Sequence, residues 1–298
     1  MTVYKQIASN KRRTVLLIAL FILFIIAMGW LFSYLFDYGY SGLFLAVIIA
    51  ISMSLVSYYS GDKVALFTAG AKGPITKEQN SYVYNLVENL SITAGLEMPK
   101  IYLIQDDSPN AFATGRDPKH ASIALTTGII NLLENQELEG VIAHELSHIK
   151  NYDIRLMMIV IICVGVIVLM ADFFLRWSIF GGRRRDVGDS RVGLILMVAG
   201  LVLMILAPLG AEAIKMAISR KREFLADASA VLLTRYPEGL ATALEKIDQV
   251  GKPLARQNKA TAHLYIASPY GKKKSWFKRL ASTHPPIEER VKALRSMA

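Results

Sequence analysis

The sequence predicts a mainly α-helical integral membrane protein with about four transmembrane helices and an α+β domain that carries a small β-sheet. Two observations predict this fold class. Hydrophobic residues make up 53% of the 298 residues, and the mean hydropathy of +0.36 is high for a soluble protein. The hydrophobic residues are concentrated in four long runs, whereas the polar stretches between and after these runs show the periodicity of ordinary helices and strands.

The four hydrophobic runs are the predicted transmembrane helices. They cover residues 14–36, 41–59, 156–175 and 192–211. The first run has no charged residue and would extend roughly 35 Å as a helix, at about 1.5 Å per residue, which is enough to cross a bilayer. Basic residues precede it and none lies in the turn after it, so the positive-inside rule places the N-terminus in the cytoplasm. Arginines lie between the last two runs, in a loop that would be outside the cell if both runs cross the membrane. Either the earlier basic residues dominate the orientation, or these two runs form a hairpin that does not fully cross.

These runs divide the chain into four parts. Residues 1–60 are expected to form an N-terminal anchor and residues 156–213 a second transmembrane hairpin, while 61–155 and 214–298 are two parts of one domain outside the bilayer. Two crossings separate these parts, so both lie on the same, cytoplasmic side. The net charge of +10 suits a surface near anionic lipid, and we assign the basic segment 272–279 to a lipid-facing or solvated surface rather than to nucleic-acid binding. A single cysteine excludes internal disulfide bonds.

Each element of the first polar stretch has a local signal. Apolar residues at helical spacing predict a helix over 77–94. Residues with high strand propensity, bounded by turn signals, predict strands at 100–104, 111–114 and 122–126. A helix then begins close to Asn135, a residue type suited to the N-cap, with glutamates that are favourable in its first turn.

The second polar stretch is expected to be helical. Predicted helices cover 215–233, 237–249 and 286–297, the last with a proline suited to its first turn. The first of them carries Glu223 and Asp227 on one face, because residues four apart are neighbours on a helix.

The helix that begins near Asn135 carries the most informative motif, His144-Glu145-x-x-His148. Positions i and i+4 lie one turn apart on the same face, so both histidines can bind one metal ion. Glu145 projects beside them, where a carboxylate can take a proton from a water at the metal. The alternative is an amphipathic helix whose two histidines bind nothing, and the rest of the chain decides between these interpretations.

A catalytic zinc ion takes three protein ligands and leaves one position open, so a third ligand is required. The extended pattern H-x-x-G-x-x-H fails, because Asn151 and Ile154 occupy its last two fixed positions. A glutamate on a later helix, with an aspartate four residues on, fits Glu223 and Asp227. The other candidates are Asp153, Glu212, Glu245, His263 and His284.

Helix packing favours Glu223 among these candidates. Small residues surround the histidines and Glu223: Gly140, Ala143, Ser147, Ala226 and Ala230. They let the two helices approach to the near end of the range of about 8–10 Å. Asp227 can then accept the second ring N–H of a ligand histidine and fix its tautomer. One zinc ion per chain at such a site suits hydrolysis of a peptide bond, with the substrate backbone paired to a strand edge near residues 110–113.

These residues resemble the HtpX family of membrane-embedded zinc metallopeptidases and its eukaryotic relatives that process prenylated proteins. The matching motifs are His144-Glu145-x-x-His148, Arg222-Glu223-Phe224-x-Ala226-Asp227, Asn110-Ala111-Phe112-Ala113-x-Gly115 and Thr283-His284-Pro285-Pro286, followed by Arg290. The order of two hydrophobic runs before the metal motif and two after it is also similar. Four runs are too few for the enclosed chamber of the eukaryotic relatives, so their prenyl-protein activity is not expected.

The resemblance implies a gluzincin-like α+β zinc metallopeptidase domain with Glu223 as the third ligand. It implies that Asn110 and Ala111 bind substrate along an edge strand, and that His284 and Arg290 stabilise the transition state. The family implies an endopeptidase of the bacterial cytoplasmic (inner) membrane, with its active site facing the cytoplasm. Its partners would be the lipid bilayer and the unfolded or damaged membrane proteins that it degrades in quality control and the stress response, and regulatory partners stay open.

Two alternatives compete with this interpretation. A protease with its motif inside a membrane span is disfavoured, because charged residues flank the motif on both sides. A non-proteolytic membrane scaffold with a structural zinc site would need a fourth protein ligand, and none is evident. Asp153 is disfavoured as a ligand because its helical angle points partly away, and the resemblance gives it a supporting role at most. His120 and His263 are expected to be ordinary surface or loop residues.

Overall fold

The computed structural model describes residues 3–35, 39–159, 198, 202, 220–258, 261–271 and 285–297. Contacts divide the chain into two compact units. Unit 1, here called the polar unit, takes its described residues from Met1–Arg12, Ser60–Met158 and Ile218–Ala298. Unit 2, the hydrophobic unit, takes them from Arg13–Tyr59 and Ile159–Ala217. The first twelve residues therefore group with the polar unit, which the sequence did not indicate.

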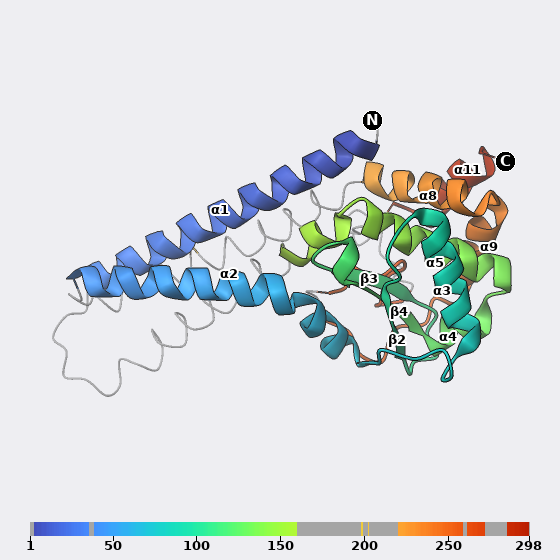
Figure 1. Cartoon of the computed structure of the whole chain (residues 1–298), viewed down its shortest axis with the longest axis horizontal. Coiled ribbons are helices and arrows are strands. Elements are labelled where there is room, and N and C mark those ends of the chain that lie inside the picture. The colour runs from blue at the N-terminus through green and yellow to red at the C-terminus, as the bar shows by residue number, and fades with distance from the viewer. Residues whose placement is uncertain are drawn as a thin grey trace. The chain divides into compact units, whose positions relative to one another are not determined.

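The hydrophobic unit contains most of two long helices, α1 (Val3–Leu35) and α2 (Gly39–Ala69) (Figure 1). In the described part of the chain, one segment, Ala8–Trp30, is long and apolar enough to cross a membrane, with a mean hydropathy of 2.3. The expected second span, 41–59, lies within α2. Most of the expected third span and nearly all of the fourth lie outside the described residues.

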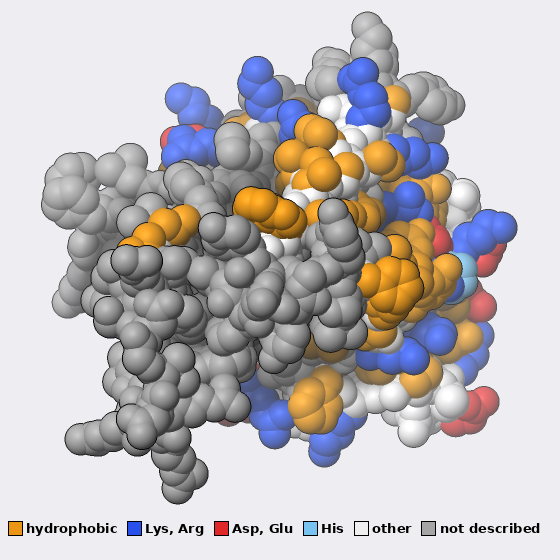
Figure 2. Space-filling model, turned by 90° about the vertical axis from the view of Figure 1, so that its left-hand side faces the viewer, with side chains coloured by type: hydrophobic (Ala, Val, Ile, Leu, Met, Phe, Trp, Pro, Cys, Tyr) orange, Lys and Arg blue, Asp and Glu red, His pale blue; other side chains and the backbone are white. Residues whose placement is uncertain are grey.

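Many apolar side chains of these two helices are exposed, as lipid-facing residues are: Val15, Leu16, Leu20, Leu23, Trp30, Phe44, Ile48 and Leu55. Hydrophobic side chains form surface patches in Figure 2, with lysine and arginine side chains beside them. This exposure fits an apolar surrounding, because a helix that is apolar on every side is stable only when lipid or protein covers it.

The polar unit contains a four-stranded sheet in the order β1-β2-β4-β3. Its strands are β1 (Ala71–Lys72), β2 (Lys100–Ile104), β3 (Ala111–Gly115) and β4 (Ala121–Thr126). β2 runs parallel to β4, and β3 runs antiparallel to β4 along the edge of the sheet. Three of these strands match the expected ranges to within one residue, whereas the two-residue β1 carries no sequence pattern that predicts it.

Seven helical segments accompany the sheet. They are α3 (Ser81–Ala94), the 3₁₀ turn η1 (Pro118–His120), α4 (Thr127–Leu132), α5 (Asn135–Lys150), α8 (Arg220–Thr234), α9 (Pro237–Val250) and α11 (Ile287–Arg295) in the described part of the chain. α3 begins at Ser81 instead of residue 77, because the side chain of Asn80 caps it by accepting the Val83 N–H at 3.0 Å. The N-cap of α5 is Glu134 and not Asn135, and the Glu137 carboxylate accepts the Glu134 N–H at 2.8 Å.

Helix α5 is the centre of the polar unit. It packs against β3, α3, α8 and α9, and its apolar residues Leu138, Val141, Ile142 and Leu146 are completely buried. Gly140 was expected to make room beside the histidines, but it lies against α9. A Cβ added there would come within 2.8 Å of the Leu240 backbone nitrogen. The small residue therefore allows α5 and α9 to touch.

Candidate metal centre and active site

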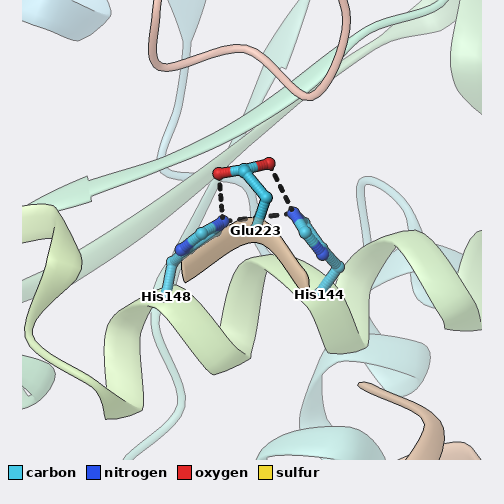
Figure 3. A group of neighbouring side chains, drawn as sticks. All are labelled: His144, His148 and Glu223. Atoms are coloured by element: carbon cyan, nitrogen blue, oxygen red, sulfur yellow. Dashed lines mark hydrogen bonds and ion pairs between the residues drawn. The ribbon is translucent and has the colours of Figure 1, made fainter. Parts of the chain in front are cut away.

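His144 and His148 on α5 and Glu223 on α8 point toward one another (Figure 3). The two Nε2 atoms are 3.1 Å apart. Glu223 reaches both rings, with Oε1 3.6 Å from His148 Nε2 and Oε2 3.9 Å from His144 Nε2. All three side chains are buried. The structure thus brings together two residues from one helix and a third from a helix more than 70 positions later in the chain.

The spacing of these atoms fits a zinc ion. Tetrahedral zinc with bonds of about 2.0–2.2 Å requires ligand atoms about 3.3–3.6 Å apart, and the three observed separations bracket that range. Within the described residues, these three form the one cluster of histidine and carboxylate side chains with this spacing. Asp153, Glu245 and His263 are not part of it, and Glu212 and His284 lie outside the described residues.

Asp227, one turn after Glu223, lies at the other nitrogen of His144. Its Oδ1 is 2.9 Å from His144 Nδ1. Arg290 on α11 donates to both oxygens of this carboxylate, from Nε to Oδ2 at 2.9 Å and from Nη2 to Oδ1 at 2.6 Å. Asp227 and Arg290 are both completely buried. A carboxylate at Nδ1 holds the ring so that Nε2 faces the metal position.

Asp153 makes the equivalent contact to the second histidine, with Oδ2 3.0 Å from His148 Nδ1. Asp153 is not part of α5, because that helix ends at Lys150. Its separation of five residues from His148 therefore does not correspond to an angle around the helix. Tyr152 has φ 60°, a left-handed conformation that turns the chain at the end of α5. The argument from helical angle therefore does not apply to Asp153, whose carboxylate is completely buried beside the ring.

Burial and neighbouring charge affect the two histidines differently. Burial lowers the pKa of His144 to about 4, and the charge of Arg290 adds to this effect against the opposing influence of Asp227. Burial also disfavours protonated His148, but the hydrogen bond to Asp153 and the surrounding carboxylates outweigh burial and raise its pKa to about 9. These directions apply to the site without a metal ion; an imidazole ligand is neutral, so protonated His148 would lose its second ring proton on binding a cation.

Glu145 lines a small cavity over the three candidate ligands. The cavity has a volume of ≈ 10 Å³, about enough for one water molecule. Its other lining residues include Ala113, Ile154, Met157, His263, Leu264 and Ile266. His263 was expected to be an ordinary surface or loop residue; it does lie in a turn, but it is buried and faces the same cavity as the three candidate ligands. His120, in contrast, lies in an exposed turn.

The expected substrate edge at Asn110 and Ala111 is covered by the chain itself. The Ile266 N–H donates to the Ala111 carbonyl at 2.9 Å. The Asn110 side chain donates to the Ala267 carbonyl at 3.0 Å and accepts from the Ala267 N–H at 3.3 Å. Residues 261–267, here called the covering segment, therefore meet the start of β3 through Ile266 and Ala267. This contact spans more than 150 residues of sequence, and no local pattern indicates it.

Among the remaining predicted site residues, Arg290 does not line the cavity; its guanidinium is paired with Asp227. His284 lies outside the described residues. The sequence missed the covering segment, and it also missed Asn10, which contacts Asp153. The pairing of an asparagine with a buried aspartate far along the chain has no spacing rule that would reveal it.

Residues 77–298 match Peptidase family M48. The chain belongs to this family. Among its M48 relatives, protease HtpX homologs from three bacteria align along nearly their full length. The one from Caldanaerobacter subterraneus subsp. tengcongensis is 46% identical over 99% of this chain and 98% of its own. The one from Thermoanaerobacter pseudethanolicus is 43% identical over 99% and 98%. The one from Streptococcus gordonii is 41% identical over 99% of both chains.

The fold is also similar to a solved structure, the crystal structure of S. mikatae Ste24p. The TM-score is 0.50 at 20% identity, over 97% of this chain and 66% of that one. This likeness shows the fold, a mostly helical M48 architecture with a small mixed sheet. The match to Peptidase family M48, the HtpX relatives and the cluster of His144, His148 and Glu223 identify this chain as a zinc metalloprotease of the membrane.

Proposed function

We propose that this protease cleaves peptide bonds of unfolded or damaged membrane proteins at the cytoplasmic face of a bacterial cytoplasmic membrane. The observation that carries the proposal is the arrangement of His144, His148 and Glu223 beside Glu145 in one cavity. Three ligands with a neighbouring carboxylate suit a catalytic zinc site, whereas a structural site is closed by four protein ligands. The HtpX relatives, at 41–46% identity over the full chain, support the assignment to proteolysis.

Each proposed role follows from the position of the side chain. His144, His148 and Glu223 hold zinc, which when bound acts as a Lewis acid that activates water and polarises the substrate carbonyl. Glu145 takes the proton from the attacking water and passes it to the leaving amine. Asp227 and Asp153 hold the two imidazole rings by their Nδ1 atoms, so that both Nε2 lone pairs converge.

Arg290 has a positioning role in this proposal, because its guanidinium is held by Asp227. His284 is the proposed donor to the negative charge that develops on the carbonyl oxygen, a role that needs a hydrogen-bond donor near the metal. Asn110 and Ala111 are proposed to bind the substrate backbone at the edge of β3.

Substrate binding at that edge requires the covering segment to move. The cavity of ≈ 10 Å³ cannot admit a peptide, and the Ala111 carbonyl is already bonded to Ile266. We therefore propose that substrate replaces residues 261–267 at the start of β3 and takes over the bonds that Ile266 and Ala267 make to Ala111 and Asn110. This exchange keeps the site closed until an extended peptide competes for the edge.

The proposed membrane topology has four transmembrane helices, at 14–36, 41–59, 156–175 and 192–211. It is supported by the apolar segment Ala8–Trp30 and by the basic residues that precede it. Two crossings between His148 and Glu223 return the chain to one side, which suits two ligands of the same ion.

The experiment compares the full chain with Glu145→Gln, in detergent or lipid vesicles, on an unfolded membrane protein. Glu145→Gln is expected to keep zinc and lose hydrolysis, because an amide cannot accept the proton. Glu139→Gln, on the same helix and paired with Asn135, is the matched control that stays active. Full activity of Glu145→Gln would remove that residue from the mechanism, and zinc binding without hydrolysis by the native chain would favour the scaffold alternative.

A further inference from the structure

Asn10 lies near the start of α1, and its side chain is buried within the polar unit. Its Nδ2 donates to the Asn151 carbonyl at 2.9 Å and to Asp153 Oδ1 at 2.8 Å. Its Oδ1 accepts from Arg222 Nη1 at 3.3 Å. One amide from the beginning of the chain therefore contacts both the turn that ends α5 and the first turn of α8.

Asp153 divides its two oxygens between this network and the metal site. Oδ2 lies 3.0 Å from His148 Nδ1, while Oδ1 accepts from Asn10 and, at 3.1 Å, from Arg222 Nη1. The carboxylate is completely buried, and a buried charge is stable only when it is paired and hydrogen-bonded. The two donors at Oδ1 therefore fix the direction in which Oδ2 faces.

The residue after Asn10 acts on the same turn. Lys11 Nζ lies 4.5 Å from the centre of the Tyr152 ring, and the Arg155 guanidinium lies 4.9 Å from it. Cations near the face of an aromatic ring are attracted to it. These contacts hold Tyr152, whose left-handed backbone is strained for a residue with a side chain. The turn that presents Asp153 to His148 is thus contacted by two residues of the N-terminal segment, Asn10 and Lys11.

We propose that Asn10 is a positioning residue for the zinc site, and that it acts through Asp153 on the orientation and tautomer of His148. The inference rests on the proposed role of His148 as a metal ligand. The segment that leads into the first hydrophobic run is then part of the metal centre as well as of the membrane anchor.

The test measures the zinc affinity of the full chain in detergent by competition with a chelator, a readout that needs no proteolysis. Asn10→Ala is expected to weaken zinc binding about 10-fold, the lower end of the range for residues that orient a ligand. Asn10→Asp has the same shape but puts a carboxylate against Asp153, so it is expected to weaken binding at least as much. Ala8→Asn adds the same amide at an exposed position of α1 and is expected to change nothing.

A double-mutant cycle with Asp153→Ala separates positioning from general packing. If Asn10 acts through Asp153, Asn10→Ala causes no further loss of zinc affinity once Asp153 is alanine. Two outcomes overturn the proposal: native zinc affinity in Asn10→Ala, or a loss in the double variant equal to the product of the two single losses. Asn10→Asp leaves no cavity, so it answers the same question if Asn10→Ala does not fold.

His148→Ala distinguishes this inference from the zinc site on which it rests. Native zinc affinity in His148→Ala would contradict the site itself. A large loss in His148→Ala together with native affinity in both Asn10 variants would contradict only the positioning role of Asn10.

Discussion

Arg290 and Asp227 form a completely buried ion pair in which two guanidinium nitrogens donate to two carboxylate oxygens, at 2.9 and 2.6 Å. The oxygen that accepts the shorter bond also lies 2.9 Å from His144 Nδ1. Arg290 is therefore linked to a candidate zinc ligand through Asp227. Arg290 Nη2 also lies 3.4 Å from His144 Nδ1, and Nη1 lies 3.7 Å from Glu223 Oε2, but the two short bonds of the guanidinium go to the aspartate.

Replacement of Arg290 by methionine is expected to destabilise the protein by about 3–5 kcal/mol, because Asp227 is left buried without its partner charge. Arg290→Lys keeps the charge but cannot donate two parallel bonds, so a smaller loss is expected. Unfolding monitored by circular dichroism measures both effects. A methionine variant as stable as the native protein would show that this ion pair contributes nothing net to the fold.

Glu223→Gln is expected to reduce zinc affinity by more than about 100-fold, beyond the range for residues that only orient a ligand. The amide has the same shape, but it lacks the negative charge that binds the cation. Metal content after dialysis measures the loss. Glu245→Gln is the matched control, because Glu245 was another candidate ligand and instead pairs with Arg295 on the surface. Retained zinc in Glu223→Gln would require a different third ligand.

Tyr265→Ala is expected to raise the rate of peptide hydrolysis about 2- to 10-fold. Tyr265 is buried in the covering segment, and its ring contacts Phe112 of β3 edge to face at 5.0 Å between centroids. Such an aromatic pair contributes about 0.5–1.5 kcal/mol. Its loss therefore raises the population of the state in which the covering segment has left β3, by the factor to which this free energy corresponds. Initial rates at low substrate concentration provide the measurement, with the exposed Tyr82→Ala as control. Unchanged or slower cleavage would contradict displacement of the segment.

Lys246→Met is expected to lower stability near neutral pH, with a difference that vanishes in acid. Burial would raise the pKa of Glu137, but hydrogen bonds from Lys246 and the Glu134 N–H outweigh burial and lower it. A carboxyl whose folded pKa is depressed stabilises the fold above its unfolded pKa, and this contribution is lost as pH falls through the folded pKa. Thermal unfolding of zinc-free protein from pH 7 to about pH 3 would measure it. A pH-independent difference would point to lost packing instead.

Gly140→Ala is expected to cost about 1–3 kcal/mol of stability, the usual range for overpacking. The added Cβ would meet backbone atoms of Leu240, which cannot rotate away as a side chain can. Gln136→Ala, an exposed site on the same helix, serves as control. Thermal unfolding distinguishes the two variants, and equal stability would show that α5 and α9 separate without cost.

Local patterns explain why much of the polar unit was predictable. β2 matches its predicted range, and α9 differs by one residue at its end, because strand propensity, helical periodicity and flanking turn residues all act within a few positions. The start of α3 was misplaced, and the N-cap of α5 was assigned to Asn135 although the helix does begin there. The N-caps are Asn80 and Glu134, and several neighbouring residues have side chains that could cap a helix equally well.

The cluster of His144, His148 and Glu223 was predictable because helix spacing and small residues restrict the possible partners of the two histidines. The covering segment, Tyr152 and Asn10 were not, since each depends on contacts between distant parts of the chain. A left-handed tyrosine has no sequence signature, and a loop that pairs with an edge strand resembles any other loop. Such features are set by tertiary packing, which sequence periodicity does not record.

The burial of Asn10 has a practical consequence for biochemistry on this enzyme. A shortened chain made by deleting everything before residue 61 would discard this amide together with all of α1 and most of α2. Without Asn10, one of the two donors to Asp153 Oδ1 is missing and Arg222 remains. Weak metal retention in such a truncated polypeptide would then reflect the missing N-terminus and would say little about the intact enzyme.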